Sequence, residues 1–212
     1  RELGIHVVET DRGHRFFFDA DDGVHGRELW VSDGTSIGTT MLGDMESGDA
    51  IDWNSEITTW MNGVVFTTNG QQGNRMWWSN GSVTTSIWQA PWFSASASSD
   101  LINQSAAITS IGQGLLQGDA SGLWFAAKET QIGLEMMHLD NNGTLHMFDL
   151  QPFGDSSPSR GVSVDGGYVV VASDGTGRQL AKLDQDGGYQ WLTSMTKEGT
   201  TTPTSVVAPA FG

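Results

Sequence analysis

The chain contains no cysteine, which excludes disulfide bonds, thiolate-ligated zinc, iron–sulfur clusters and a cysteine nucleophile. Basic residues are scarce: 10 Lys and Arg stand against 25 Asp and Glu, which gives a formal net charge of −15. Nucleic acids and anionic membrane surfaces are bound by clustered cations, so we expect neither as a partner. No hydrophobic run approaches the roughly 18 residues of a membrane-spanning helix, so we expect no membrane insertion.

Glycine, by contrast, is abundant, with 28 residues among 212. This is about twice its ordinary usage and is typical of many short strands joined by tight turns. The acidic surface is also poor in lysine, which occurs only as Lys128, Lys182 and Lys197. Such a surface stays hydrated at high ionic strength, which favours an extracellular or cell-surface protein. An ordinary acidic cytosolic domain is the alternative.

Three glycine-marked features recur four times in the same order, with a period of roughly 50 residues. The first is a turn glycine before a hydrophobic strand, at Gly13, Gly63, Gly122 and Gly167. The second is a loop glycine before another strand, at Gly26, Gly73, Gly133 and Gly177. The third is a turn dipeptide, at Asp33-Gly34, Asn80-Gly81, Asn142-Gly143 and Asp186-Gly187. Such dipeptides supply the positive φ angles that tight hairpins need.

Each repeat therefore holds four short antiparallel strands, with no helical periodicity between them. The sequence predicts an all-β fold, a β-propeller with four blades of four antiparallel strands. The approximate blades are residues 1–48, 49–100, 101–155 and 156–203. A β-sandwich is the alternative, but it would not repeat the same turn marks four times in order.

Residues 204–212 are predicted to contain one more strand, Ser205-Val206-Val207. This strand could close the ring by pairing with the region of Ile5–Val8. It could instead open a further blade of a larger ring, or pair with another copy of the protein by strand addition.

The second strand and turn of the first repeat read Gly26-Arg27-Glu28-Leu29-Trp30-Val31-Ser32-Asp33-Gly34-Thr35. This segment closely resembles the ELWxxDGT repeat of large secreted and surface-attached microbial proteins. The resemblance implies a β-propeller fold and a secreted or surface location, and it carries no catalytic residues because the motif is structural. The fourth repeat, with Gly188-Tyr189-Gln190-Trp191, is instead similar to generic bacterial and archaeal β-propeller repeats.

The motif predicts specific contacts. Because strand side chains alternate between faces, we expect Leu29 to face an adjoining blade while Trp30, on the other face, covers the neighbouring surface. Asp33 can accept hydrogen bonds from the backbone of its own turn, so Asp33→Ala should destabilise the protein.

An acidic loop offers candidate metal ligands. Asp19, Asp21 and Asp22 could supply oxygen ligands to calcium, the one cofactor that the sequence suggests. The loop lacks the ligand spacing of an EF-hand, and turn formation explains the same residues. The five histidines show no zinc-binding spacing.

Exposed aromatic residues and glycosylation sequons are the remaining candidate sites. Trp88, Trp92 and Phe93 precede a run of small polar residues and are predicted to lie on an inserted loop. They could stack on sugars or anchor a protein partner, or the loop could fold over its own blade. Asn80, Asn103 and Asn142 each begin an N-x-S/T sequon and are candidate glycosylation sites.

No catalytic constellation is recognisable in the sequence. We therefore expect an extracellular, non-enzymatic structural or adhesive propeller that binds a protein partner, a glycan or copies of itself. The alternative is a glycan-active hydrolase with acidic residues at the mouth of the propeller channel.

Overall fold

A computed structural model of the chain describes residues 3–10, 13–46, 48–52, 55–70, 73–87, 108–111, 115–129 and 131–195. The regular elements in these ranges are β-strands that form four separate sheets. No helix in the described ranges has the length and hydrophobicity needed to cross a membrane.

Each sheet is built from strands that follow one another in the chain. Sheet 1 contains β1 (His6–Thr10), β2 (Gly13–Asp21), β3 (Arg27–Ser32) and β4 (Thr40–Met41). Sheet 2 contains β5 (Ile57–Trp60), β6 (Gly63–Gly70), β7 (Gly73–Ser79) and β8 (Thr84–Ser86). Sheet 3 contains β9 (Ile108–Ile111), β10 (Gln117–Gly118), β11 (Gly122–Glu129), β12 (Gly133–Asp140) and β13 (Leu145–Phe148). Sheet 4 contains β14 (Val162–Val164), β15 (Gly167–Ser173), β16 (Arg178–Asp184) and β17 (Tyr189–Trp191).

All neighbouring strands within a sheet are antiparallel, as the hairpin turns predicted. The predicted boundaries at 48/49 and 155/156 fall between sheets, in the connections from β4 to β5 and from β13 to β14. Sheet 3 departs from the simple pattern, because both β9 and β10 pair with β11. Its first strand is thus divided into two short pieces.

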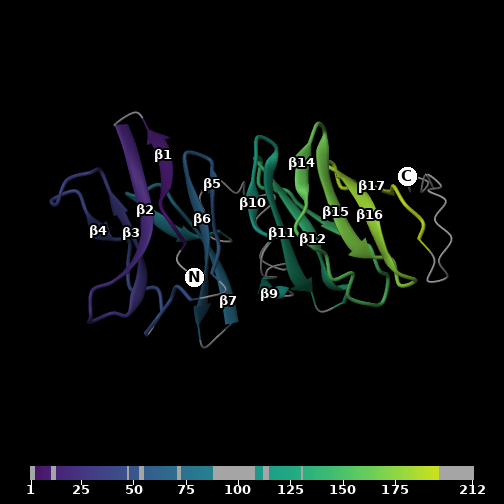
Figure 1. The fold of residues 1–212 in the computed structure, drawn as a ribbon, viewed down its shortest axis with the longest axis horizontal. Helices are drawn as coiled ribbons and strands as arrows, with labels where there is room; N and C mark the ends of the chain where they lie inside the picture. Colours follow the sequence, from purple (N-terminus) through teal and green to yellow (C-terminus); the bar gives the residue numbers. More distant parts are fainter. Residues whose placement is uncertain are drawn as a thin grey trace.

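The four sheets stand in chain order along the longest dimension of the molecule, from sheet 1 at one end to sheet 4 at the other (Figure 1). One buried hydrophobic cluster joins sheets 1 and 2, a second joins sheets 2 and 3, and a third joins sheets 3 and 4. The described part of the chain contains no such cluster between sheets 1 and 4. The core is therefore a series of three junctions between consecutive sheets.

Strand alternation gives each sheet two faces, which we call forward (toward the next sheet) and backward (toward the preceding one). In sheet 1, Leu29 is fully buried on the forward face, within the cluster shared with sheet 2. Trp30 lies on the backward face opposite Phe18 and is half-buried. The expected division between Leu29 and Trp30 is confirmed.

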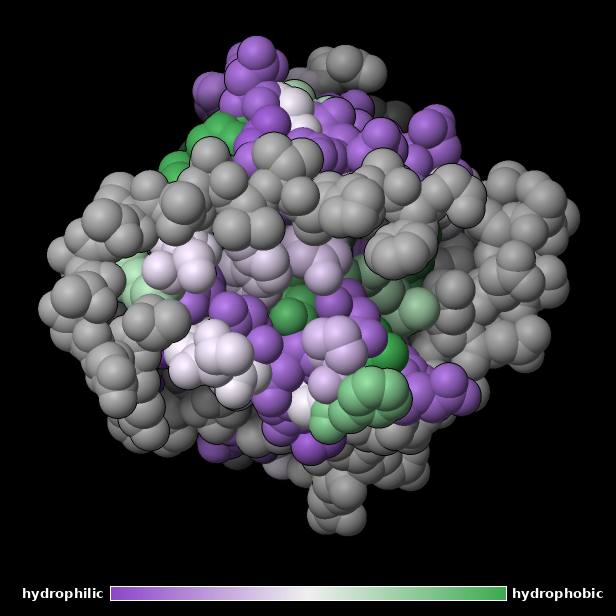
Figure 2. Space-filling model, turned by 90° about the vertical axis from the view of Figure 1, so that its right-hand side faces the viewer, coloured by the Kyte–Doolittle hydropathy of each residue, from purple (hydrophilic) through white to green (hydrophobic). Residues whose placement is uncertain are grey.

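The backward face of sheet 1 and the forward face of sheet 4 form the two ends of this series. Figure 2 looks onto the end that carries sheet 4, where hydrophobic residues lie among hydrophilic ones. Val162 and Val164 on β14 are exposed at this end, with 57% and 38% of their surface accessible.

Candidate functional site

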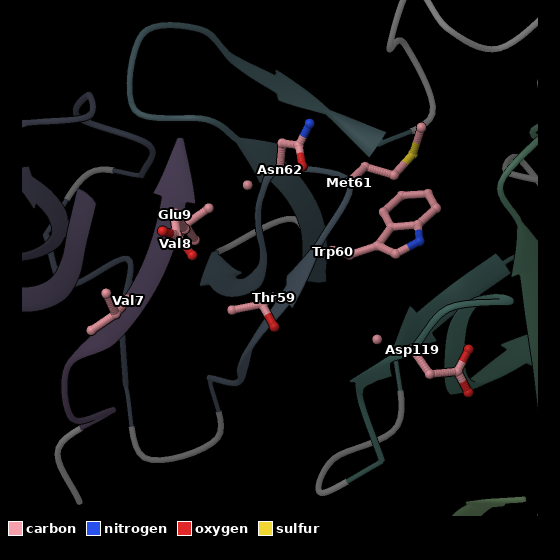
Figure 3. Close-up of a pocket in the computed structure, with 10 residues that line it drawn as sticks. Val7, Val8, Glu9, Thr59, Trp60, Met61, Asn62 and Asp119 are labelled. Carbon is pink, nitrogen blue, oxygen red and sulfur yellow. The ribbon is translucent and has the colours of Figure 1, made fainter. Parts of the chain in front are cut away.

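A pocket of about 390 Å³ lies beside the first strands of sheets 1, 2 and 3. Its lining residues come from β1, from the β5–β6 hairpin and from the end of β10 (Figure 3). They are Val7, Val8, Glu9, Thr59, Trp60, Met61, Asn62, Gly63, Gly118 and Asp119. Among the described residues, the lining contains two carboxylates and no lysine or arginine, so it favours a cationic or hydrogen-bonding group.

The β5–β6 turn places two lining side chains in an unusual backbone conformation. Trp60 pairs with Gly63, which leaves Met61 and Asn62 as the two central residues of the hairpin turn. Their φ angles are 47° and 56°, as a type I′ turn requires, yet Met61 is not a residue that favours this region. Met61 also packs against the cluster between sheets 2 and 3, which offsets the cost of its conformation.

Trp60 forms a fixed wall of the pocket. Its side chain is buried and its indole N–H donates to Asn141 Oδ1 in sheet 3, at 2.9 Å. Its backbone oxygen accepts a hydrogen bond from the Trp78 indole N–H at 3.3 Å. The bond to Asn141 joins sheets 2 and 3 at the edge of the pocket, and the bond from Trp78 lies within sheet 2, so both hold this wall in place.

Asp119 lies in the turn after β10 and is surrounded by hydrogen-bond donors. Its Oδ1 accepts from the Ser121 backbone N–H (2.8 Å), the Ser121 hydroxyl (2.6 Å) and the Gly122 backbone N–H (3.1 Å). Its Oδ2 accepts from the Trp124 indole (3.0 Å) and from the Ser163 hydroxyl of sheet 4 (2.6 Å). Burial opposes ionisation, but the bonds from Ser121 and Ser163 outweigh it and hold the pKa of Asp119 below its usual range. Asp119 therefore serves as an ionised link between sheets 3 and 4.

Glu9, by contrast, is exposed at the end of β1. It makes no hydrogen bond or ion pair with any residue in the described ranges. In Figure 3 the Asp119 carboxylate points away from Glu9, with Thr59 between the two residues. Of the two carboxylates that line the pocket, Glu9 is the one available to a ligand.

Outside the pocket, Glu28 on β3 and Glu135 on β12 occupy matching positions in their sheets, and the pKa of each is raised. Burial is the largest cause in both and raises the pKa of Glu28 and of Glu135 to about 7. Glu135 accepts the backbone N–H groups of Leu150 (3.0 Å) and Ser156 (2.9 Å), in the connection between sheets 3 and 4. Glu28 accepts the Met45 N–H at 3.4 Å, in the connection between sheets 1 and 2. These glutamates hold the chain segments that leave their sheets.

The predicted calcium ligands are each bonded within the chain. Asp19 accepts the backbone N–H of Leu3 and pairs with the Arg27 guanidinium. Asp21 accepts the Gly23 N–H, and Asp22 accepts two backbone amides and contacts His25 Nδ1 at 2.7 Å. Within the described ranges, no group of three or more His, Asp or Glu side chains is arranged to hold a metal ion. A calcium site at this loop stays a prediction.

The sequons have two different environments where the structure describes them. Asn142 is exposed in the β12–β13 turn, whereas Asn80 is half-buried and its Oδ1 accepts the backbone N–H groups of Ser82 and Val83. Trp88, Trp92, Phe93 and Asn103 lie outside the described residues, as does the predicted strand at 205–207.

Sequence reasoning missed the pocket residues Glu9, Thr59, Met61 and Asn62. One local signal was present: Met61-Asn62 stands where the corresponding hairpin of sheet 4 has Asp165-Gly166, a dipeptide suited to the turn. A residue unsuited to its turn is a reason to examine that position for function.

Comparisons with known proteins identify the fold and nothing finer. No family model and no curated protein matches the chain. Among solved structures, it is similar to a puromycin hydrolase mutant complexed with PGG, with a TM-score of 0.51, 14% identity and coverage of 94% of this chain and 30% of that one. The fold is propeller-like. The chain is also similar to puromycin hydrolase in a second structure (TM-score 0.47, 13% identity, 95% and 30% covered) and to TolB from Acinetobacter baumannii (0.45, 13%, 86% and 42%). It thus spans less than half the length of these propeller-containing chains.

Proposed function

We propose that this chain is an extracellular, non-enzymatic structural or adhesive propeller module that binds a protein partner in the pocket beside β1 and the β5–β6 hairpin. The observation that carries the proposal is the exposed carboxylate of Glu9, which has no partner among the described residues and lies at a pocket whose described lining includes no basic residue. A lysine or arginine side chain of the partner complements this carboxylate in charge. The acidic, lysine-poor composition supports the extracellular location.

The shape and chemistry of the lining favour a protein side chain over a sugar. Trp60 is only 4% exposed, so its ring offers no open face on which a sugar could stack. The Met61 side chain offers an apolar contact for the methylene stem of a long cationic side chain, and Asn62 and Thr59 add hydrogen-bonding groups.

The test is a comparison of three proteins on two arrays, one of synthetic peptides and one of glycans. Wild type should bind peptides that contain lysine or arginine, and Glu9→Gln should bind them at least about 10-fold more weakly because the charge pair is lost. Asp165→Asn makes the same charge change in the exposed β14–β15 turn and should bind as wild type does. Binding to glycans alone, or equal peptide binding by Glu9→Gln, would count against the proposal.

A second candidate function is favoured by one observation, the presence of Glu9 and Asp119 in the same pocket. A glycan-active hydrolase needs two carboxyl groups that flank the scissile bond, one of which donates a proton. Asp119 is poorly suited to donate because its five hydrogen bonds favour the ionised form. Release of reducing sugar from a polysaccharide panel by wild type, abolished in Glu9→Gln, would establish this function instead.

A further inference from the structure

The two ends of the row of sheets carry the two halves of one repeated junction. In each internal junction, the forward face of one sheet packs on the backward face of the next. The strand registers place Phe16, Phe18 and Trp30 on the backward face of sheet 1 at the positions of Leu123, Phe125 and Met137 in sheet 3. The sheet 3 residues are completely buried, whereas the sheet 1 residues are all half-buried. The backward face of sheet 1 is therefore built like an internal face but is only partly covered.

The forward face of sheet 4 shows the same contrast. Val169 and Leu180 correspond by register to Trp124 and Met136 of sheet 3. The residues in sheet 3 have no exposed surface, whereas Val169 and Leu180 are half-buried. Exposed Val162, which pairs with Val169, extends this apolar face onto β14. The two end faces are thus one forward and one backward face, which is the combination that every internal junction uses.

The third turn of each sheet supports this correspondence independently. A Cβ placed on Gly81, in the β7–β8 turn of sheet 2, would contact Val31 and Phe17 on the forward face of sheet 1. Gly187, in the β16–β17 turn of sheet 4, lies in the same way against His146 of sheet 3. The equivalent turn of sheet 1, at Asp33-Gly34, contacts no other sheet in the described part of the chain, and the nearby Ile37 is 93% exposed.

Charge complements the shapes of the two end faces. His138 of sheet 3 faces the turn of sheet 4, with its Nδ1 3.2 Å from the Gln185 oxygen. Lys182 is the residue of sheet 4 at the position of His138, and among the described residues its one ion pair is with Asp184 on its own strand, at 3.3 Å. A sheet that packed on sheet 4 as sheet 4 packs on sheet 3 would bring its turn to Lys182. In a second copy, that turn carries Asp33.

We propose that a second copy of this chain docks head-to-tail, with the backward face of its sheet 1 on the forward face of sheet 4. The contact continues the junction already used three times within the chain, and it places Asp33 of one copy near Lys182 of the other. A head-to-tail contact is heterologous, so repeated docking produces a closed ring or an open chain of copies, according to the rotation at each contact. The inference does not depend on the pocket that contains Glu9.

The test changes one exposed hydrophobic side chain at each end, so that the fold is preserved. Ile37→Asp blocks the backward end and Val162→Asp blocks the forward end. Phe153→Asp is the control, because Phe153 is fully exposed on the connection between sheets 3 and 4. Sedimentation velocity is measured over about 1–200 µM, which covers dissociation constants in the micromolar class. Runs at about 0.15 M and 0.5 M NaCl reduce the repulsion between copies of an acidic protein.

Wild type and Phe153→Asp should self-associate, whereas Ile37→Asp alone and Val162→Asp alone should each self-associate at least about 10-fold more weakly. A mixture of Ile37→Asp and Val162→Asp should form a species of two chains and nothing larger, because one intact junction remains. Lys182→Glu should weaken association at the lower salt concentration. A monomeric wild type over the whole range overturns the proposal, as does full self-association by either blocked variant. The peptide-array comparison of wild type with Glu9→Gln is a separate measurement, so the proposed function and the head-to-tail contact can each fail alone.

Discussion

Glu135 and Gln179 occupy the same register position in sheets 3 and 4, each opposite an alanine of the neighbouring strand, Ala127 and Ala172 respectively. Both side chains bind the segment that follows the fourth strand of their sheet. Glu135 accepts the N–H groups of Leu150 and Ser156, and Gln179 Oε1 accepts the Met195 N–H at 2.7 Å. The small alanine leaves room for a polar side chain to turn toward the backbone. Either Glu or Gln at this position can therefore accept hydrogen bonds from the segment that follows the fourth strand.

Glu135→Gln should fold and should reduce the dependence of stability on pH. The pKa of Glu135 is raised to about 7 by burial, so between its unfolded value of 4.5 and about 7 the folded state binds more protons. Its contribution to stability is therefore complete below pH 4.5 and is lost as pH rises to about 7. Thermal unfolding from pH 4.5 to 8 should show a flatter decline for Glu135→Gln than for wild type.

The exposed variant Asp165→Asn is the control for this measurement, because it removes a carboxylate that no other sheet covers. If the stability of Glu135→Gln fell with pH as steeply as that of wild type, Glu135 would not be the source of the pH dependence. Glu28, whose pKa is also raised to about 7, should supply the slope that remains in Glu135→Gln.

Gly26→Ala should destabilise the protein more than Gly23→Ala. Both glycines have a positive φ, 82° and 79°, so alanine costs roughly 1–2 kcal/mol of backbone strain at either position. A Cβ on Gly26 would also lie 2.7 Å from the Gly48 carbonyl carbon and 2.8 Å from Asp49 Oδ1, whereas nothing lies within 4 Å of a Cβ on Gly23. Chemical denaturation of the two variants measures the difference, and equal free energies of unfolding would refute the close packing of this connection.

Asp33→Ala should lower the thermal midpoint, and Asp33→Asn should leave it nearly unchanged. Asp33 Oδ1 accepts the backbone N–H of Thr35 at 2.9 Å and its hydroxyl at 2.7 Å. Asparagine keeps an acceptor oxygen at this position, whereas alanine leaves both donors of the turn to water. Differential scanning calorimetry distinguishes the two variants. A midpoint in Asp33→Ala equal to that of wild type would show that the turn does not need the side chain.

The repeat and its turns were predictable because they depend on neighbouring residues. Leu145–Phe148, Ile57–Trp60 and Val162–Val164 form the short strands that flank the turn glycines of sheets 3, 2 and 4. The division of the first strand of sheet 3 into β9 and β10 was not predictable, since it depends on pairing with β11 rather than on local propensity. The pocket was missed for a related reason: Glu9, Met61 and Asp119 are far apart in the sequence and meet only when three sheets stand side by side.

By itself, the sequence determined the all-β class, the four repeats and the antiparallel hairpins, because Gly and Asx residues fix backbone turns locally and strand side chains alternate between faces. Only the tertiary structure decided which faces of the repeats pack together and which side chains remain uncovered or unbonded. It set the order in which forward and backward faces meet, left Phe16 and Val169 partly uncovered at opposite ends, and bonded Asp119 five times while leaving Glu9 unpaired. The physical reason is that burial and hydrogen-bond partners come from other sheets, and residue patterns within one repeat do not specify them.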